Sequence, residues 1–250
     1  MKSTACAPPC APPEKREPLR RSEALERAAA LLVAGADLDA SLKQAGYRST
    51  RSNVARMTSN VSPAELVNMF TDRNCALIAD PALLDIGVHL EPGGITALLA
   101  APFAPRVDVS QGDAQQQVLA LVNKARAVAR KCGDKPFTPA KALQYNTVLA
   151  RAALAHSADM ARNNYFSHDG RDGSNPAQRV ERAGYRYRAT GENIAAGMTT
   201  PEDAVAGWIK SPPHCANLMS QSYTEMGVAF TVSSKSEMGV YWAQEFGAPR

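Results

Sequence analysis

The stretch "GENIAAGMTTPEDAVAGWIKSPPHCANLM", residues 191–219, contains a short helix with a clear start and stop. Thr200 can cap the helix, Pro201 suits its first position, and Asp203 completes a capping-box pattern. The prolines at 212 and 213 forbid continuation of the same helix. Its apolar face consists of Ala204, Val205, Trp208 and Ile209. The polar residues Glu192 and His214 stand at the two ends of this scaffold.

Helical patterns come before this stretch and strand patterns follow it. Apolar residues spaced three or four apart predict helices over 113–131 and 147–163. Alternating apolar residues in "EMGVAFTV" (225–232) and "VYWAQEF" (240–246) predict an antiparallel hairpin. Helices and strands are therefore grouped rather than alternating, which favours an α+β or layered α/β domain over a doubly wound sheet.

Composition narrows the class of protein. The 250 residues are 45% hydrophobic, which is enough for a substantial core, and the net charge of +4 is scattered. The absence of a basic stripe with interleaved aromatics argues against nucleic acid as a partner. No apolar run approaches the roughly 18 residues that a membrane span needs.

The N-terminus lacks the apolar region of a signal peptide. The residues "STAC" before residue 7 only faintly resemble a lipoprotein signal, so lipidation at Cys6 is a minority hypothesis.

The chain also contains an internal repeat. We predict that residues 19–106 are a shortened, divergent copy of residues 107–250, and that residues 1–18 form a proline-rich tail. Three pairs of segments support the repeat: "QAGYRSTRSNVA" (44–55) with "RAGYRYRATGENIA" (182–195), "SPAELVNMF" (62–70) with "TPEDAVAGW" (200–208), and "LERAAAL" (25–31) with "LARAALA" (149–155).

The two copies differ in their polar groups. Ser52 stands opposite Glu192, Asn74 opposite His214 and Asp85 opposite Glu225, while the segment around His168 has no counterpart. Residues needed only for folding should tend to occur in both copies. The difference therefore points to a functional role for the His and Glu residues of the second copy.

The repeat predicts two symmetric disulfides, Cys132 to Cys215 and Cys10 to Cys75. Each would close a loop of more than 60 residues and contribute on the order of 3 to 4 kcal/mol. Disulfides persist in oxidising compartments, whereas five reduced cysteines would remain the alternative.

Six motifs in order resemble the CAP superfamily of cysteine-rich secretory proteins, antigen 5 and pathogenesis-related proteins, in its bacterial SCP-like form. The resemblance covers roughly residues 111–248. The motifs are "LVNKAR" (121–126), "LARAALAHSADMARNNYFSHDGRDG" (149–173), "GENIA" (191–195), "AVAGWIKSPPHCANLM" (204–219), "EMGVAF" (225–230) and "YWAQEFG" (241–247).

The resemblance implies a three-layer α-β-α sandwich, a secreted or periplasmic location at the cell envelope, and a cleft that can hold a divalent metal. Carried over by motif, the metal ligands are His168, Glu192, His214 and Glu225. Two imidazoles and two carboxylates suit zinc best. Asn193 and Trp208 are expected to brace the cleft.

Several functions stay open at this point. The cleft can bind a metal or a small ligand without catalysis, or act as a metal-dependent hydrolase on a peptide, ester or cell-wall substrate. A lipid- or sterol-binding or protein-interaction module is a further alternative. Outside the predicted ligands, His156 lies on the apolar face of its helix and is predicted to be a core residue, while His89 is predicted to be exposed.

Overall fold

The computed structural model describes residues 17–250. The chain forms two compact units, and the boundary between them along the chain lies between Phe103 and Ala104. This junction lies three residues before the predicted boundary at 106/107. Almost all of the predicted tail, together with Cys6 and Cys10, falls outside the described residues. No helix within residues 17–250 is long and apolar enough to cross a membrane.

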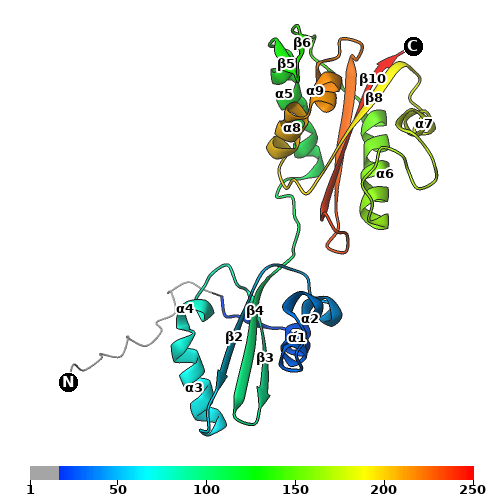
Figure 1. Ribbon diagram of the computed structural model, residues 1–250. Helices are drawn as coiled ribbons and strands as arrows, with labels where there is room; N and C mark the ends of the chain where they lie inside the picture. The colour runs from blue at the N-terminus through cyan, green and yellow to red at the C-terminus, as the bar shows by residue number, and fades with distance from the viewer. Residues whose placement is uncertain (1–16) are drawn as a thin grey trace. The chain divides into compact units, whose positions relative to one another are not determined.

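The second unit is a three-layer α-β-α sandwich, as predicted (Figure 1). Its four-stranded sheet has the order β7-β9-β10-β8. Helices α5, α8 and α9 cover one face of the sheet, and α6 and α7 cover the other (Figure 1). The elements are α5 (Gln111–Arg126), β5 (Arg130–Cys132), β6 (Lys135–Phe137), β7 (Gln144–Tyr145), α6 (Thr147–Asn163), α7 (Pro176–Arg182), β8 (Tyr187–Ala196), α8 (Pro201–Lys210), α9 (Pro212–Met219), β9 (Glu225–Val232) and β10 (Val240–Pro249).

The predicted helix start and hairpin are confirmed. The Thr200 side chain accepts a hydrogen bond from the Asp203 backbone N–H, and β9 pairs antiparallel with β10, with Phe230 opposite Trp242. Two features differ from the expectation. The helix predicted over 113–131 ends at Arg126, and residues 130–132 form the strand β5. The prolines at 212 and 213 also begin a new helix, α9, because proline is well suited to a first helical turn. Residues 187–196 form the edge strand β8.

Helix α9 is held in place by a disulfide to strand β5 and by a buried arginine of α5. Cys132 and Cys215 are bonded, as predicted, which ties the β5–β6 hairpin to α9. The guanidinium of Arg126, which is 1% exposed, donates to the carbonyls of Leu218 at 2.6 Å and Ser220 at 2.9 Å. Burial lowers the pKa of Arg126 to about 10.

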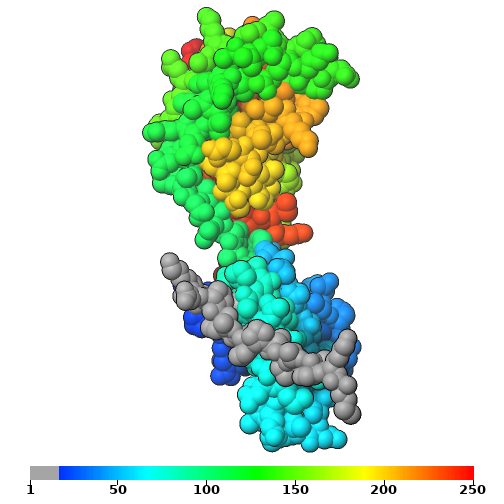
Figure 2. Space-filling model, turned by 90° about the vertical axis from the view of Figure 1, so that its left-hand side faces the viewer, coloured from blue at the N-terminus to red at the C-terminus, as the bar shows by residue number. Residues whose placement is uncertain are grey.

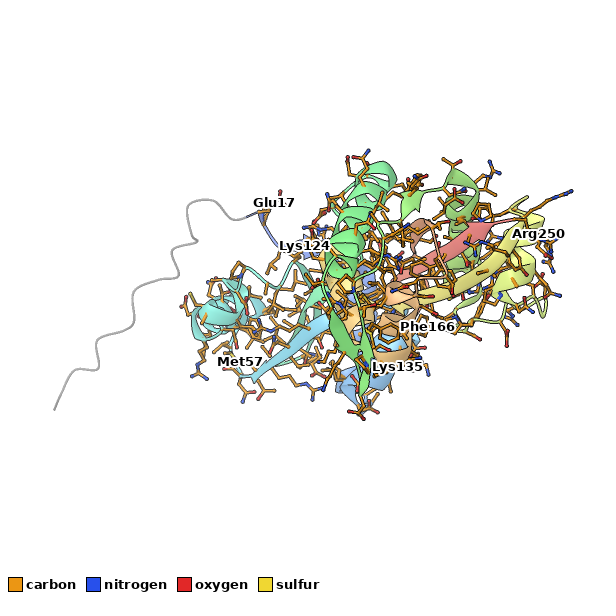
Figure 3. The ribbon with its side chains drawn as sticks, turned by 90° about the horizontal axis from the view of Figure 1, so that it is seen from above. Glu17, Met57, Lys124, Lys135, Phe166 and Arg250 are labelled. Carbon is orange, nitrogen blue, oxygen red and sulfur yellow. A yellow bond between two sulfur atoms is a disulfide. The ribbon has the colours of Figure 1, made fainter. Side chains whose placement is uncertain are left out.

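The three helices of this layer lie side by side in the space-filling view (Figure 2). Lys124 marks α5 and Lys135 marks the hairpin in the view from above (Figure 3).

The first unit also has a four-stranded sheet between two helical layers (Figure 1). Its order, β1-β3-β4-β2, and its strand directions match those of the second sheet: the short outer strand is parallel to its neighbour, and the other pairs are antiparallel. The elements are β1 (Arg20–Arg21), α1 (Glu23–Val33), α2 (Leu38–Ala45), β2 (Ser49–Thr58), α3 (Pro63–Arg73), α4 (Cys75–Ile78), β3 (Asp85–Glu91) and β4 (Gly94–Pro102).

One glycine in each unit allows a helix to lie directly on the sheet. A Cβ atom at Gly87 would lie 2.2 Å from the backbone carbon of Leu25 on α1. A Cβ atom at Gly227 would lie 2.0 Å from the backbone nitrogen of Ala150 on α6. Because backbone atoms cannot move aside as a side-chain tip can, both positions exclude every residue except glycine.

We predict that Gly227→Ala destabilises the second unit by about 3 kcal/mol, because the added methyl group forces α6 away from β9. Urea unfolding followed by tryptophan fluorescence measures this effect, since Trp208 and Trp242 both lie in the second unit. Gly112→Ala is the control: its Cβ would have an open position in α5, so stability should stay the same or rise slightly. Equal midpoints for Gly227→Ala and the wild type would contradict the close approach.

Candidate functional site

A buried carboxylate, Glu192, lies at the centre of the site. It is on the edge strand β8, and its side chain is 1% exposed. Its Oε1 lies 2.6 Å from Nδ1 of His168, and its Oε2 accepts a hydrogen bond of 2.6 Å from Nη2 of Arg179. Both carboxylate oxygens are therefore engaged by basic side chains.

His168 is oriented by this carboxylate. It lies on the loop after α6, and its side chain is 48% exposed. Because a carboxylate can only accept, Nδ1 of His168 carries the proton of the 2.6 Å hydrogen bond. The other ring nitrogen, Nε2, is then an acceptor or metal ligand when the ring is neutral.

The second imidazole comes from the opposite helical layer. His214 lies in the first turn of α9, and its ring centroid is 6.3 Å from that of His168. Burial and the neighbouring His168 lower the pKa of His214, so its ring is neutral near neutral pH. The structure thus brings together three predicted ligands, His168, Glu192 and His214, beside an edge strand that both layers can reach.

Glu245 is a fourth acidic residue that the sequence analysis missed. It lies directly opposite Glu192 on β10 and is fully buried. Burial and the charge of Glu192 raise the pKa of Glu245 well above its usual value. Burial alone would raise the pKa of Glu192 too, but the hydrogen bond from His168 helps to lower it. Of the two carboxyl groups, Glu245 therefore holds a proton more readily than Glu192. The sequence did contain a signal for Glu245, because a glutamate stands within the mostly apolar strand "YWAQEF".

His156 is buried, as predicted for a core residue, but it also touches the site. Its Nε2 donates to the carbonyl of Ser167 at 3.0 Å and lies 3.7 Å from Oε2 of Glu192. Burial lowers the pKa of His156, so the ring is neutral. Arg179, which the sequence analysis also missed, supplies the positive charge that Glu192 needs.

Amide side chains hold α9 against the sheet. Asn193 donates to the carbonyl of His214 at 3.2 Å and to Gln244 at 3.1 Å, and it accepts from Asn217 at 3.1 Å. The indole of Trp208 donates to the carbonyl of Ile194 at 3.0 Å. Asn193 therefore fixes the backbone of His214, and Trp208 fixes its own helix to strand β8.

Glu225 does not join the other three predicted ligands. It lies on β9, two strands away from Glu192 on β8, a lateral spacing of about 10 Å. The register adds an offset of two residues along the strands, because Glu225 pairs with Gly247 of β10 and Glu192 pairs with Glu245. Tyr185 and Asn146 donate to its carboxylate instead. The first unit contains the same kind of pair, because Tyr47 donates to Asp85 at 2.7 Å. The expectation that Glu225 completes the cleft is therefore corrected to a pairing with a tyrosine.

The site offers two imidazole ligands rather than a complete set of protein ligands for a metal ion. Within residues 17–250, no group of three or more His, Cys, Asp and Glu side chains is placed to hold a metal ion. Glu192 supports His168 through a hydrogen bond, which is how second-layer carboxylates orient metal-binding or proton-accepting histidines.

Comparisons in sequence and structure found similar proteins. Two proteins of Bacillus subtilis match in sequence: the uncharacterized protein YkwD is 34% identical over 53% of this chain and 46% of its own length, and the uncharacterized membrane protein YlbC is 36% identical over 34% of this chain and 25% of its own. The chain thus spans less than half the length of these relatives. An extracellular SCP-domain protein of Bacillus anthracis is similar in structure, with 24% identity, a TM-score of 0.47, and coverage of 65% of this chain and 56% of that one.

A family model described as the cysteine-rich secretory protein family, CAP, matches residues 119–246. This range is just over half of the chain, and it contains the whole cluster of His168, Glu192, His214 and Glu245. The chain belongs to the cysteine-rich secretory protein (CAP) family.

Proposed function

We propose that this is a secreted or periplasmic CAP-domain protein that binds a divalent metal ion through His168 and His214. The observation that carries the proposal is the 2.6 Å hydrogen bond from Nδ1 of His168 to the buried carboxylate of Glu192. Metal-binding histidines commonly donate their second ring nitrogen to a carboxylate in this way, which fixes the tautomer and makes the ligating nitrogen more basic.

The donor set fits a borderline ion such as zinc. Both imidazoles are neutral ligands when deprotonated, and the lowered pKa of His214 favours that form. Glu192 acts as the supporting carboxylate, because His168 and Arg179 occupy its oxygens. Water or a bound ligand would complete the coordination of an ion held by two histidines. Such an ion supplies Lewis acidity when bound.

A hydrolase is the second candidate, and the same hydrogen bond favours it. A histidine that donates Nδ1–H to a buried carboxylate can take a proton from water through Nε2. A hydrolase of this kind predicts turnover of a peptide, ester or cell-wall substrate that is abolished in both His168→Ala and Glu192→Gln. Chelator sensitivity would show whether a metal takes part.

The disulfide supports export from the cytoplasm. Cys132 and Cys215 close a long loop, and such bonds persist in oxidising compartments. The pairing of Cys10 with Cys75 stays a prediction, because Cys10 lies outside the described residues. Both disulfides would suit an envelope or extracellular protein.

We further propose that the first unit is a divergent copy of the second and serves as a structural or interaction module. The shared strand order and the paired glycines, Gly87 and Gly227, support a common origin. With Gly87 at the position of Gly227, strand register places Val54, rather than Ser52 of the sequence alignment, at the position of Glu192, and neither side chain can provide a carboxylate. The first unit is therefore not proposed to hold a metal.

We predict that zinc titration, measured by isothermal calorimetry, detects binding to the wild type and at least tenfold weaker binding to His168→Ala and His214→Ala. Glu192→Gln should bind 10- to 100-fold more weakly, because the ligand loses its orienting carboxylate. His89→Ala is the matched control, since His89 lies in the first unit. Equal zinc affinity in all variants would exclude the site.

We predict that Glu245→Gln stabilises the protein relative to the wild type as pH rises. The folded-state pKa of Glu245 is raised, so the folded chain keeps a proton that the unfolded chain releases above about pH 4.5. Wild-type stability should therefore fall relative to Glu245→Gln by about 1.4 kcal/mol per pH unit up to the folded-state pKa. Urea unfolding between pH 4 and 8 measures the difference, with the exposed Glu202→Gln as control. A constant difference across this range would show that Glu245 is ionised in the folded protein.

A further inference from the structure

A cavity of about 490 Å³ lies between α6, α7 and the loop that joins them. Small side chains leave the space, because Ala152 and Ala155 on α6 face Ala183 after α7 across the opening. The volume falls within the range of small-molecule sites. The polar and charged lining residues are Arg151, His156, Asp159, Asp172, Ser174, Arg179 and Arg182.

Both aspartates in the lining are already occupied by donors from the protein. Asp159 accepts hydrogen bonds from Asn163 at 2.7 Å and from Tyr165. Asp172 accepts from the backbone N–H of Ser174 at 2.9 Å and from Arg182 at 2.6 Å. Their carboxylates therefore offer little to a ligand.

The three arginines, in contrast, have donors to spare. Arg151 donates one hydrogen bond, to the carbonyl of Ala183, and Arg182 donates one, to Asp172. Arg179 donates two, to Ser174 and Glu192. These four bonds use a minority of the five N–H groups on each guanidinium. Nε of Arg179 is buried and has no hydrogen-bond partner among residues 17–250, and the Arg179 side chain is 9% exposed.

The lining therefore presents hydrogen-bond donors to the cavity. The three arginines are balanced in charge by the two aspartates and by Glu192, which Arg179 binds, so their free N–H groups rather than a net charge favour a ligand. Guanidinium groups bind carboxylate and phosphate oxygens with two parallel hydrogen bonds, which makes arginine the usual partner of such groups.

We propose that this cavity binds a small ligand through an oxyanion group, carboxylate or phosphate, held by Arg151 and Arg182 at the rim and Arg179 at the wall. The site is separate from the two histidines, because neither His168 nor His214 lines the cavity. Arg179 is the link between the two sites, since it also binds Glu192.

Inorganic phosphate and acetate, titrated separately into the ¹⁵N-labelled full chain and followed by NMR, test this proposal. We expect saturable shifts at residues of the cavity, and the anion that binds more tightly identifies phosphate or carboxylate as the ligand chemistry. The double variant Arg151→Gln/Arg182→Gln should bind that anion at least tenfold more weakly. Ala155→Phe should do the same by filling the cavity from an exposed position on α6.

Two matched variants on the same helix control for charge and bulk. Arg162→Gln removes an exposed arginine of α6 that does not line the cavity, and Leu154→Phe enlarges an exposed side chain next to Ala155. Both should bind the anion like the wild type. The proposal is overturned if neither anion shifts the cavity residues, or if the control variants lose binding as much as the cavity variants do.

Discussion

A carboxylate buried on strand β8 has to be compensated, and most of the site follows from how Glu192 meets that requirement. Removing an ion from water costs several kcal/mol, so an ionised buried group needs partners with matching charge and geometry. His168 and Arg179 each bind one of its oxygens at 2.6 Å. A second negative charge beside it would be unfavourable, and burial together with the charge of Glu192 accordingly raises the pKa of Glu245. The exposed ring of His168 is therefore oriented from within the core.

The edge position of β8 explains how two helical layers can contribute to one site. His168 follows α6 on one face of the sheet, while His214 begins α9 on the other. The distance between their rings would change if α9 moved. Three contacts hold this helix: the disulfide to Cys132, the hydrogen bonds from Arg126 to backbone carbonyls, and the amide of Asn193. Rigid support of this kind is what a binding site needs to keep its groups in place.

Comparing the two units helps to distinguish residues that support the fold from residues of the site, but the comparison misled for Glu225. Glu192 has no carboxylate counterpart in the first unit, because the sequence alignment places Ser52 opposite it and strand register places Val54 there. The change from Glu225 to Asp85 looked similar in the sequence, but both carboxylates accept a hydrogen bond from a tyrosine. A difference between the two units therefore points to function here only where the chemistry of the side chain changes.

The sequence by itself predicted helices α6 and α8, the β9–β10 hairpin, the Cys132–Cys215 pair and the region of the site, because periodicity, caps and motifs are properties of the chain itself. It placed the end of α5 too late and did not predict α9. It also predicted His168, Glu192 and His214, through their motifs and their absence from the first copy. Only the tertiary structure decided that Glu245 faces Glu192, that Arg179 reaches it from α7, and that Glu225 lies two strands away. Strand register sets these neighbours, and burial sets their charges. Neither can be read from residues that are 13 to 53 positions apart in the chain.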